Sequence, residues 1–277
     1  MRTMSQSSLI DEGCLVVMAD SVVEASSIVE ASSAVRSSPA AKSSPANDSA
    51  IKSKLKIKPK VKLIMFDLDG TLMHTAPELA TAINLMLVDL GLQTLPASQI
   101  QSYIGEGAVV LLKRCLTGKL NTEPDEALLN KAQIIFFAHY AQHLTLSLPF
   151  DGVIDALQAL QNKDYKLACV TNKPAQFAQP LLLKSGLNHF FEMVVSGDTL
   201  SKKKPDPMQL LHICATLNVP IEQALLVGDS ATDIAAAKAA GCFIVTVPYG
   251  YNQGRVIDES SVDANIEDLT QLIALLE

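Results

Sequence analysis

The stretch Phe66-Asp67-Leu68-Asp69-Gly70-Thr71-Leu72 follows directly on an apolar run at residues 63–66. Alternate residues of a strand face the same side, so Asp67 and Asp69 are expected to lie together, and Gly70 lets the backbone turn sharply after them. Two carboxylates placed in this way can hold a divalent cation, while one attacks an electrophile and the other gives and then takes a proton. A polar turn that only closes a buried strand is the alternative interpretation.

Two further polar segments suit an anion. Thr171, Asn172 and Lys173 follow an apolar run and precede a proline that can open a helix, so free backbone N–H groups are expected there. A basic loop at residues 202–204 precedes another helical pattern, and one of its lysines is a candidate to face a phosphate. The alternatives are an ordinary helix cap for the first segment and a solvated charge run for the second.

The fourth polar segment ends the apolar run at residues 225–227. Asp229 is placed at the C-terminal end of this predicted strand, where open α/β sheets gather their functional groups. Ser230 and Asp233 form an S-x-x-D pattern. Asp233 therefore either caps the Ala-rich helix that follows or takes part in the site.

Taken in this order, the four segments resemble the motifs of the haloacid dehalogenase-like superfamily of phosphotransferases, over about residues 63–276. One departure is that His74-Thr75 stands where the closest family usually shows Asp-Ser. That family is phosphoglycolate phosphatase, and the longer stretches that resemble it are Asp67-Leu68-Asp69-Gly70-Thr71-Leu72 with Ala76-Pro77-Glu78-Leu79-Ala80, Gly105-Glu106-Gly107-Ala108, Val170-Thr171-Asn172-Lys173-Pro174, Gly197-Asp198-Thr199-Leu200, Lys203-Lys204-Pro205, Val227-Gly228-Asp229-Ser230 and Tyr249-Gly250-Tyr251-Asn252.

The resemblance implies a role for each acidic residue. Asp67 would be the nucleophile that attacks phosphorus, and Asp69 would protonate the leaving oxygen and then activate water. Mg2+ would be held by Asp67, the backbone carbonyl of Asp69 and Asp229, with Asp233 orienting these ligands; oxygen ligands of this kind suit Mg2+.

The resemblance also implies how the phosphoryl group is bound. Thr171, the backbone N–H of Asn172 and Lys204 would neutralise and position it, because phosphoryl transfer needs cationic groups and donors around the equatorial oxygens. Lys173 is a further candidate substrate-binding residue beside them.

A substrate that carries a carboxylate as well as a phosphate needs additional donors. Gly105, Glu106 and Gly107 form a predicted flexible loop with exposed N–H groups, and Lys113 and Arg114 on the following helix are candidate carboxylate binders. Both cations are otherwise ordinary solvent-facing residues.

The predicted function is a Mg2+-dependent phosphomonoesterase that hydrolyses 2-phosphoglycolate through an aspartyl-phosphate. Asp69 favours a phosphatase or phosphomutase, because water attack on an aspartyl-phosphate needs a nearby base. Another small phosphate remains an alternative substrate: a sugar phosphate (including a mutase cycle), a nucleotide or pyrophosphate. A non-catalytic binding protein is disfavoured because Asp67 and Asp229 are both present.

Composition limits the partners. The chain has 277 residues, 48% of them hydrophobic, and a formal net charge of -7, which argues against nucleic acid because a phosphate backbone demands a basic face. No apolar stretch approaches the roughly 20 residues of a membrane-spanning helix. The five cysteines show no C-x-x-C spacing, so reduced thiols and a cytoplasmic location are expected. The expected partner is a small phosphorylated substrate; oligomeric state stays open.

The pattern of elements predicts an α/β fold with a doubly wound parallel sheet and a small all-helical cap inserted after the first strand. Residues 1–57 are rich in Ser and Ala and are predicted to be a mostly disordered extension without a secretory signal. Residues 58–75 and 149–277 are predicted to form the core, and residues 76–148 the cap. Strands are expected near residues 63–66, 166–170, 193–196, 224–227 and 243–247.

Three histidines are further candidate site residues. His139 and His143 have the i, i+4 spacing of a zinc pair, but the sequence offers no Glu in the H-E-x-x-H pattern and no other ligand nearby, so metal binding is not expected. His74 is interpreted as a surface hinge residue, with substrate contact as the alternative.

Overall fold

The computed structural model describes residues 61–142, 147–253 and 255–277. The predicted extension at residues 1–57 and the expectations for Cys14 and His143 therefore lie outside the described residues.

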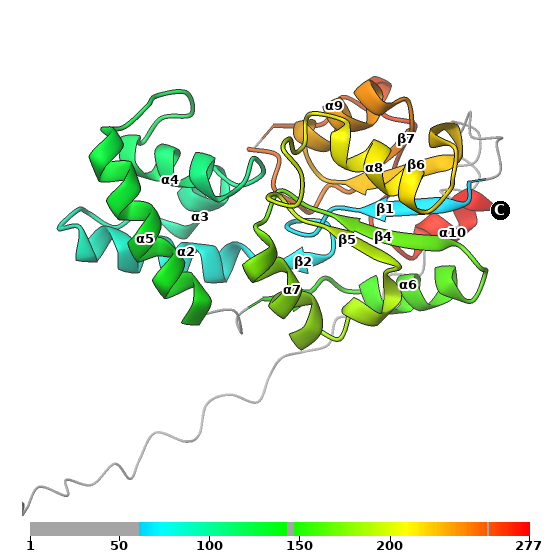
Figure 1. The fold of residues 1–277 in the computed structure, drawn as a ribbon, viewed down its shortest axis with the longest axis horizontal. Helices are drawn as coiled ribbons and strands as arrows, with labels where there is room; N and C mark the ends of the chain where they lie inside the picture. The colour runs from blue at the N-terminus through cyan, green and yellow to red at the C-terminus, as the bar shows by residue number, and fades with distance from the viewer. Residues whose placement is uncertain (1–60, 143–146, 254) are drawn as a thin grey trace, which may run out of the picture. The chain divides into compact units, whose positions relative to one another are not determined.

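A six-stranded sheet forms the centre of the fold, in the order β5-β4-β1-β6-β7-β8 (Figure 1). All of its pairings are parallel, which confirms the predicted parallel sheet. The edge strand β8 was not predicted, because it is too short to show a pattern. The bounds are β1 (Leu63–Phe66), β4 (Lys166–Val170), β5 (Met193–Val195), β6 (Ala224–Gly228), β7 (Phe243–Thr246) and β8 (Ala264–Asn265).

Helices cover both faces of this sheet, as a doubly wound fold requires. Ile64 and Phe66 of β1 belong to the hydrophobic cluster of one face, and Leu63 and Met65 to that of the other. All four side chains are fully buried, which explains why the strand reads as a continuous apolar run. The first face carries α6 (Val153–Gln161), α7 (Ala175–Lys184) and α10 (Gln271–Leu276), and the second carries α8 (Met208–Thr216) and α9 (Ala231–Ala240) (Figure 1).

Four helices between β2 (Met73–His74) and β3 (Leu148–Pro149) form a separate layer, here called the insertion. They are α2 (Ala76–Asp89), α3 (Ala97–Gln101), α4 (Ala108–Thr117) and α5 (Glu126–Gln142). Their apolar faces share one hydrophobic cluster, to which Phe177 of α7 and Tyr251 also belong. The insertion lies to the left of the sheet in Figure 1.

The two ends of the insertion meet in a short antiparallel ribbon. Met73 pairs with Pro149 and His74 with Leu148. These two strands were not predicted, because two residues are too few to show an alternating pattern. The ribbon places the chain's exit from the core and its return side by side, and it contains His74, the predicted hinge residue.

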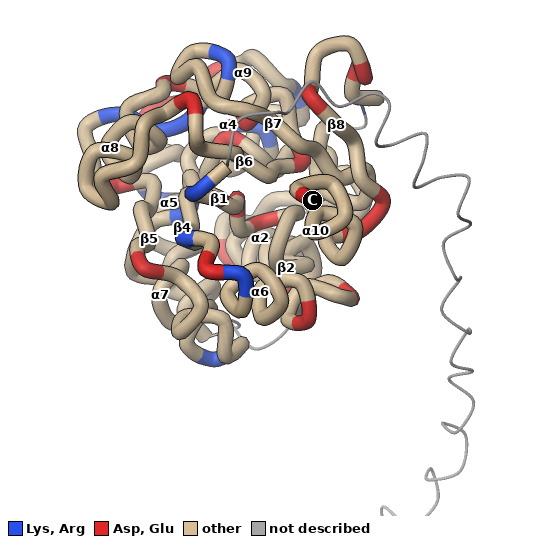
Figure 2. The backbone as a smooth tube through the Cα atoms, turned by 90° about the vertical axis from the view of Figure 1, so that its right-hand side faces the viewer, with Lys and Arg blue, Asp and Glu red and all other residues tan. Residues whose placement is uncertain are grey.

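The described residues carry both acidic and basic side chains, as the composition indicates. Acidic and basic residues are interspersed along the backbone in the view of Figure 2. No helix in the described ranges has both the length and the apolar content needed to cross a membrane.

Candidate active site

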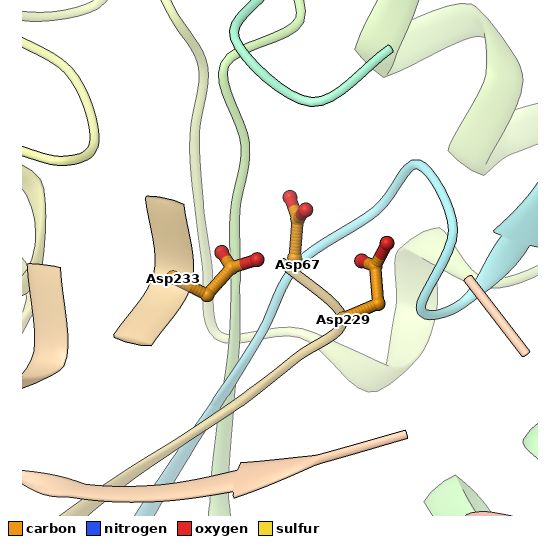
Figure 3. Close-up of side chains that lie close together, drawn as sticks. All are labelled: Asp67, Asp229 and Asp233. Carbon is orange, nitrogen blue, oxygen red and sulfur yellow. The ribbon is translucent and has the colours of Figure 1, made fainter. Parts of the chain in front are cut away.

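Three aspartates meet where β1 and β6 end (Figure 3). Asp67 follows β1 directly, and its N–H donates to Val227 O at 2.9 Å, which continues the pairing with β6. Asp229 follows β6, and Asp233 lies in the first turn of α9. Oxygens of the three side chains all lie within 4.8 Å of one another. Adjacent parallel strands bring their carboxyl ends to one edge of the sheet, so this convergence is a consequence of topology.

This cluster is electrostatically costly as it stands. Burial raises the pKa of Asp67 to about 7 and raises the pKa of Asp229 well above its ordinary value, and the neighbouring aspartates add to both shifts. Lys204 offsets part of this cost, since its Nζ lies 2.9 Å from Asp67 Oδ1 and 2.7 Å from Asp233 Oδ1. Three carboxylates against one ammonium group call for a further cation.

The donors around each carboxylate decide which oxygens are free for that cation. Both oxygens of Asp233 are engaged: Oδ1 by Lys204, and Oδ2 by the N–H and the hydroxyl of Ser230. Asp229 accepts from the Thr71 hydroxyl at 2.8 Å and from the Tyr251 N–H at 2.5 Å. Asp67 Oδ2 receives no hydrogen bond from the described residues. All-oxygen donors and an open oxygen on Asp67 fit a hard divalent cation such as Mg2+.

Asp233 makes two kinds of contact. It forms the capping box of α9 with Ser230, and it also holds Lys204. Gly228 makes this possible, because a Cβ at that position would lie 2.5 Å from Asp233 Cβ. Gly250 has the same relation to Asp229, where a Cβ would lie 2.3 Å from Asp229 Cβ.

The polar segment after β4 lies beside the aspartates. Thr171 lines the cavity described below, and its Oγ1 accepts from the Lys173 N–H at 3.1 Å, which leaves its own O–H free to donate. Asn172 Nδ2 donates to Lys204 O at 2.9 Å, which ties this loop to the lysine loop. Gln209, which sequence reasoning did not single out, accepts from the Lys204 N–H and donates to Thr171 O.

A chain of polar contacts, here called the Glu78 network, joins the insertion to Asp69. Lys173 Nζ donates to Asp69 Oδ1 at 2.9 Å and also to the hydroxyl of Tyr140 on α5. That hydroxyl donates to Glu78 Oε1 on α2 at 2.6 Å, and Lys173 Nζ lies 3.9 Å from the same oxygen. Glu78 is fully buried, and its Oε2 has no hydrogen-bond partner.

Sequence reasoning missed Glu78 and Tyr140. Glu78 stood in a quoted motif and in the first turn of a predicted helix, where an acidic residue is ordinarily explained by the helix dipole. Tyr140 lies in a helix whose other buried residues are apolar. A buried carboxylate needs partners, so the signal in both cases is burial, which becomes visible only in the fold.

A cavity lies between the insertion and the ends of β1 and β4. Its volume is about 40 Å3. One water needs roughly 10–15 Å3 on the same scale, so the space is large enough for a compact group of a few heavy atoms. Asp67, Asp69, Thr171, Asn172 and Lys173 line it from the core, together with Pro174 and Phe177, and the insertion contributes Leu79, Ile104, Gly105, Gly107, Ala108, Leu111, Phe136 and Tyr140.

The structure places the two expected carboxylate binders elsewhere. Lys113 Nζ lies 2.8 Å from Glu123 at the surface, and Arg114 is buried against Glu106. The Arg114 guanidinium also donates to Tyr103 O at 3.0 Å, so it stabilises the loop before α4. Neither side chain lines the cavity, because each is held by an acid of the insertion itself.

The remaining expected site residues divide between the cavity and the surface. Gly105 and Gly107 line the cavity, whereas Glu106 accepts from Arg114 and from Gln253. His74 in the ribbon is exposed and lies 2.9 Å from the Tyr251 hydroxyl. His139 Nε2 lies 2.7 Å from Asp89 Oδ2, an ion-pair geometry.

The chain belongs to the haloacid dehalogenase-like hydrolase family, whose model matches residues 64–247. It is 47% identical over 211 residues to a phosphoglycolate phosphatase of Thiobacillus denitrificans, covering 76% of this chain and 93% of that protein. It is 48% identical over 217 residues to a phosphoglycolate phosphatase of Nitrosospira multiformis, covering 78% of this chain and 96% of that protein. The crystal structure of a predicted phosphoglycolate phosphatase from Haemophilus somnus is similar with a TM-score of 0.74 and 34% identity, covering 79% of this chain and 99% of that chain.

Proposed function

We propose that this protein hydrolyses 2-phosphoglycolate to glycolate and phosphate, with Mg2+ as cofactor and an aspartyl-phosphate on Asp67 as intermediate. The observation that carries the proposal is the convergence of Asp67 and Asp69 on one small cavity, with Lys204 at Asp67 and Asp229 beside it. The relatives named phosphoglycolate phosphatase support the choice of substrate.

Asp67 is the nucleophile in this proposal. Its Oδ2 attacks phosphorus while the bond from phosphorus to the glycolate oxygen breaks, and Asp69 gives that oxygen its proton. Asp69 then takes a proton from a water that attacks the same phosphorus. The bond from phosphorus to Asp67 breaks, phosphate leaves and both carboxyl groups return to their starting states.

Donors around Asp67 hold the transferring group. The Thr171 hydroxyl, the Asn172 N–H and the Lys204 ammonium group take the phosphoryl oxygens, where negative charge accumulates. Asp67, the backbone carbonyl of Asp69 and Asp229 are the residues that would hold Mg2+, and Asp233 orients Lys204 beside them. Bound there, the ion supplies positive charge to the phosphoryl oxygens.

The insertion acts as a cap over this chemistry. We assign residues 76–148 to the cap and residues 58–75 and 149–277 to the core, joined through the ribbon of β2 and β3. The insertion contributes Tyr140, Phe136 and Leu111 to the cavity wall. When the insertion closes on the core, these side chains exclude water from the reacting groups.

A cytoplasmic location is part of the proposal. It is supported by the free thiols of Cys115, Cys169, Cys214 and Cys242, a state that a reducing compartment maintains.

Phosphate release from a panel of phosphomonoesters tests the proposal. We expect 2-phosphoglycolate to be turned over with the highest kcat/KM of the panel, and turnover to stop when EDTA removes divalent metal and to return when Mg2+ is restored. A preference for a hexose phosphate or a nucleotide would reject the substrate, and full activity in EDTA would reject the cofactor.

A further inference from the structure

Three lysines lie at or beside the cavity: Lys173 lines it, and Lys203 and Lys204 line a neighbouring open pocket. Lys204 contacts Asp67, Asp233 and the Val170 carbonyl, and it is already assigned to the phosphoryl end of the substrate. Lys173 donates to Asp69 and lies 3.9 Å from the buried Glu78.

Lys173 has little capacity left for a second anionic group of the substrate. Its ammonium group donates to Asp69 and to the Tyr140 hydroxyl, and it lies 3.9 Å from the fully buried Glu78. The substrate's carboxylate therefore has to be directed to another part of the cavity wall.

Lys203 is the third lysine, and unlike Lys173 and Lys204 it has no acidic side chain bound to its ammonium group among the described residues. Within the described residues its side chain forms neither a hydrogen bond nor an ion pair, although the residue is half-buried. Burial lowers the pKa of Lys203, as expected for an ammonium group that has lost water without gaining a partner. Glu106 is the acid that acts on it electrostatically, but Glu106 is itself bound by Arg114 and Gln253.

Lys203 lines the neighbouring open pocket, and Gly107 of the cavity wall lies against its ammonium group. A Cβ at Gly107 would lie 2.7 Å from Lys203 Nζ and 3.1 Å from Asn172 O, so the bare glycine makes room for the lysine. Gly107 and Asn172 both line the cavity that contains Asp67 and Asp69. Lys203 belongs to the core and Gly107 to the insertion, so the contact spans the boundary between the two.

We propose that Lys203 is the specificity-determining residue that binds the carboxylate of the substrate, at the boundary marked by Gly107. The inference rests on the proposed function and deepens it. The phosphoryl end of the substrate is held by Thr171, Asn172 and Lys204, and the carboxylate lies toward Lys203 on the insertion side of Asn172. This assignment replaces Lys113 and Arg114, which are held by Glu123 and Glu106.

The test compares 2-phosphoglycolate with ethyl phosphate, which has a similar size and no carboxylate. Lys203→Ala is expected to lower kcat/KM for 2-phosphoglycolate by roughly 10- to 100-fold, mainly through KM, since a hydrogen bond between charged groups is lost. Its kcat/KM for ethyl phosphate should stay within about twofold of the unsubstituted protein. Lys203→Arg should recover most of the activity on 2-phosphoglycolate, because a guanidinium also binds a carboxylate.

Lys202→Ala is the matched control. Lys202 is the neighbouring lysine, exposed, with its Nζ 3.0 Å from Asp206, and its loss should leave both substrates unaffected. Equal losses on both substrates in Lys203→Ala, with an unchanged melting temperature, would overturn the inference, as would no loss on either. If the unsubstituted protein hydrolyses ethyl phosphate but not 2-phosphoglycolate, the proposed function itself fails, and the inference fails with it.

Discussion

Substitution of Tyr140 by Phe tests whether the Glu78 network holds the insertion to the active site. The change removes one hydroxyl from a side chain that is 2% exposed. That hydroxyl is the hydrogen-bond donor to Glu78 Oε1, at 2.6 Å, and Glu78 Oε2 already lacks a partner. Among the described residues, the carboxylate would then keep only Lys173, at 3.9 Å.

The expected loss follows from these contacts. A hydrogen bond to a charged group contributes about 1.5–3 kcal/mol, and a buried acceptor left without its donor costs a comparable amount. For a protein of this size 1 kcal/mol corresponds to roughly 2–4 °C, so the melting temperature should fall by about 3–12 °C. Lys173 also loses an acceptor, so Asp69 is held less firmly and kcat should fall by about tenfold with little change in KM.

Thermal unfolding and steady-state kinetics measure both effects. Tyr103→Phe is the matched control, because the Tyr103 hydroxyl lies in the same insertion and accepts from the neutral Gln99 side chain at 3.0 Å. Tyr103→Phe should lower the free energy of unfolding by less than about 1.5 kcal/mol. The double variant with Glu78→Gln should lose less than the sum of the single losses, since the two side chains share one contact. A Tyr140→Phe protein with unchanged stability and kcat would show that the Glu78 network does not hold the insertion to the site.

Two more predictions concern the aspartate cluster. The pKa of Asp67 is raised to about 7, so ionising this group costs stability as the pH rises from about 4 to about 7. Asp67→Asn should therefore abolish turnover. In EDTA at pH 8 its free energy of unfolding, measured by urea titration, should be about 2–4 kcal/mol higher than that of the unsubstituted protein. This difference should vanish toward pH 4. Mg2+ at 100 times its Kd should raise the melting temperature of the unsubstituted protein by about 5–10 °C. Asp229→Asn should show almost none of this increase, and an equal increase in both proteins would place the ion elsewhere.

The parts of the fold that follow from the chain's periodicity could be predicted. The apolar runs gave β1, β4, β5, β6 and β7, because strands buried on both faces leave an unmistakable pattern. Convergence of Asp67 and Asp229 followed from the same step, since adjacent parallel strands end at one edge. The two-residue strands β2, β3 and β8 carry too few residues for a pattern.

Partners of charged side chains could not be predicted in the same way. Lys173 meets Asp69, 104 positions away, and Tyr140 meets Glu78, 62 positions away. Arg114 has the chemistry of a carboxylate binder, and the fold gives it Glu106 of its own insertion. A sequence shows which side chains can bind an anion, but packing decides which of them are already taken, and Lys203 stands out only after that step.

Asp67 is proposed to accept the phosphoryl group, and direct detection of that group on Asp67 tests this role. The measurement uses the Asp69→Asn variant, which lacks the base for water attack, with Mg2+ and an aryl phosphate whose leaving group needs no acid. After rapid acid quench, mass spectrometry of the peptide that contains residues 63–72 should show one added phosphoryl group on Asp67. Absence of that group throughout the time course, while the leaving group is released with a burst, would contradict covalent catalysis by Asp67.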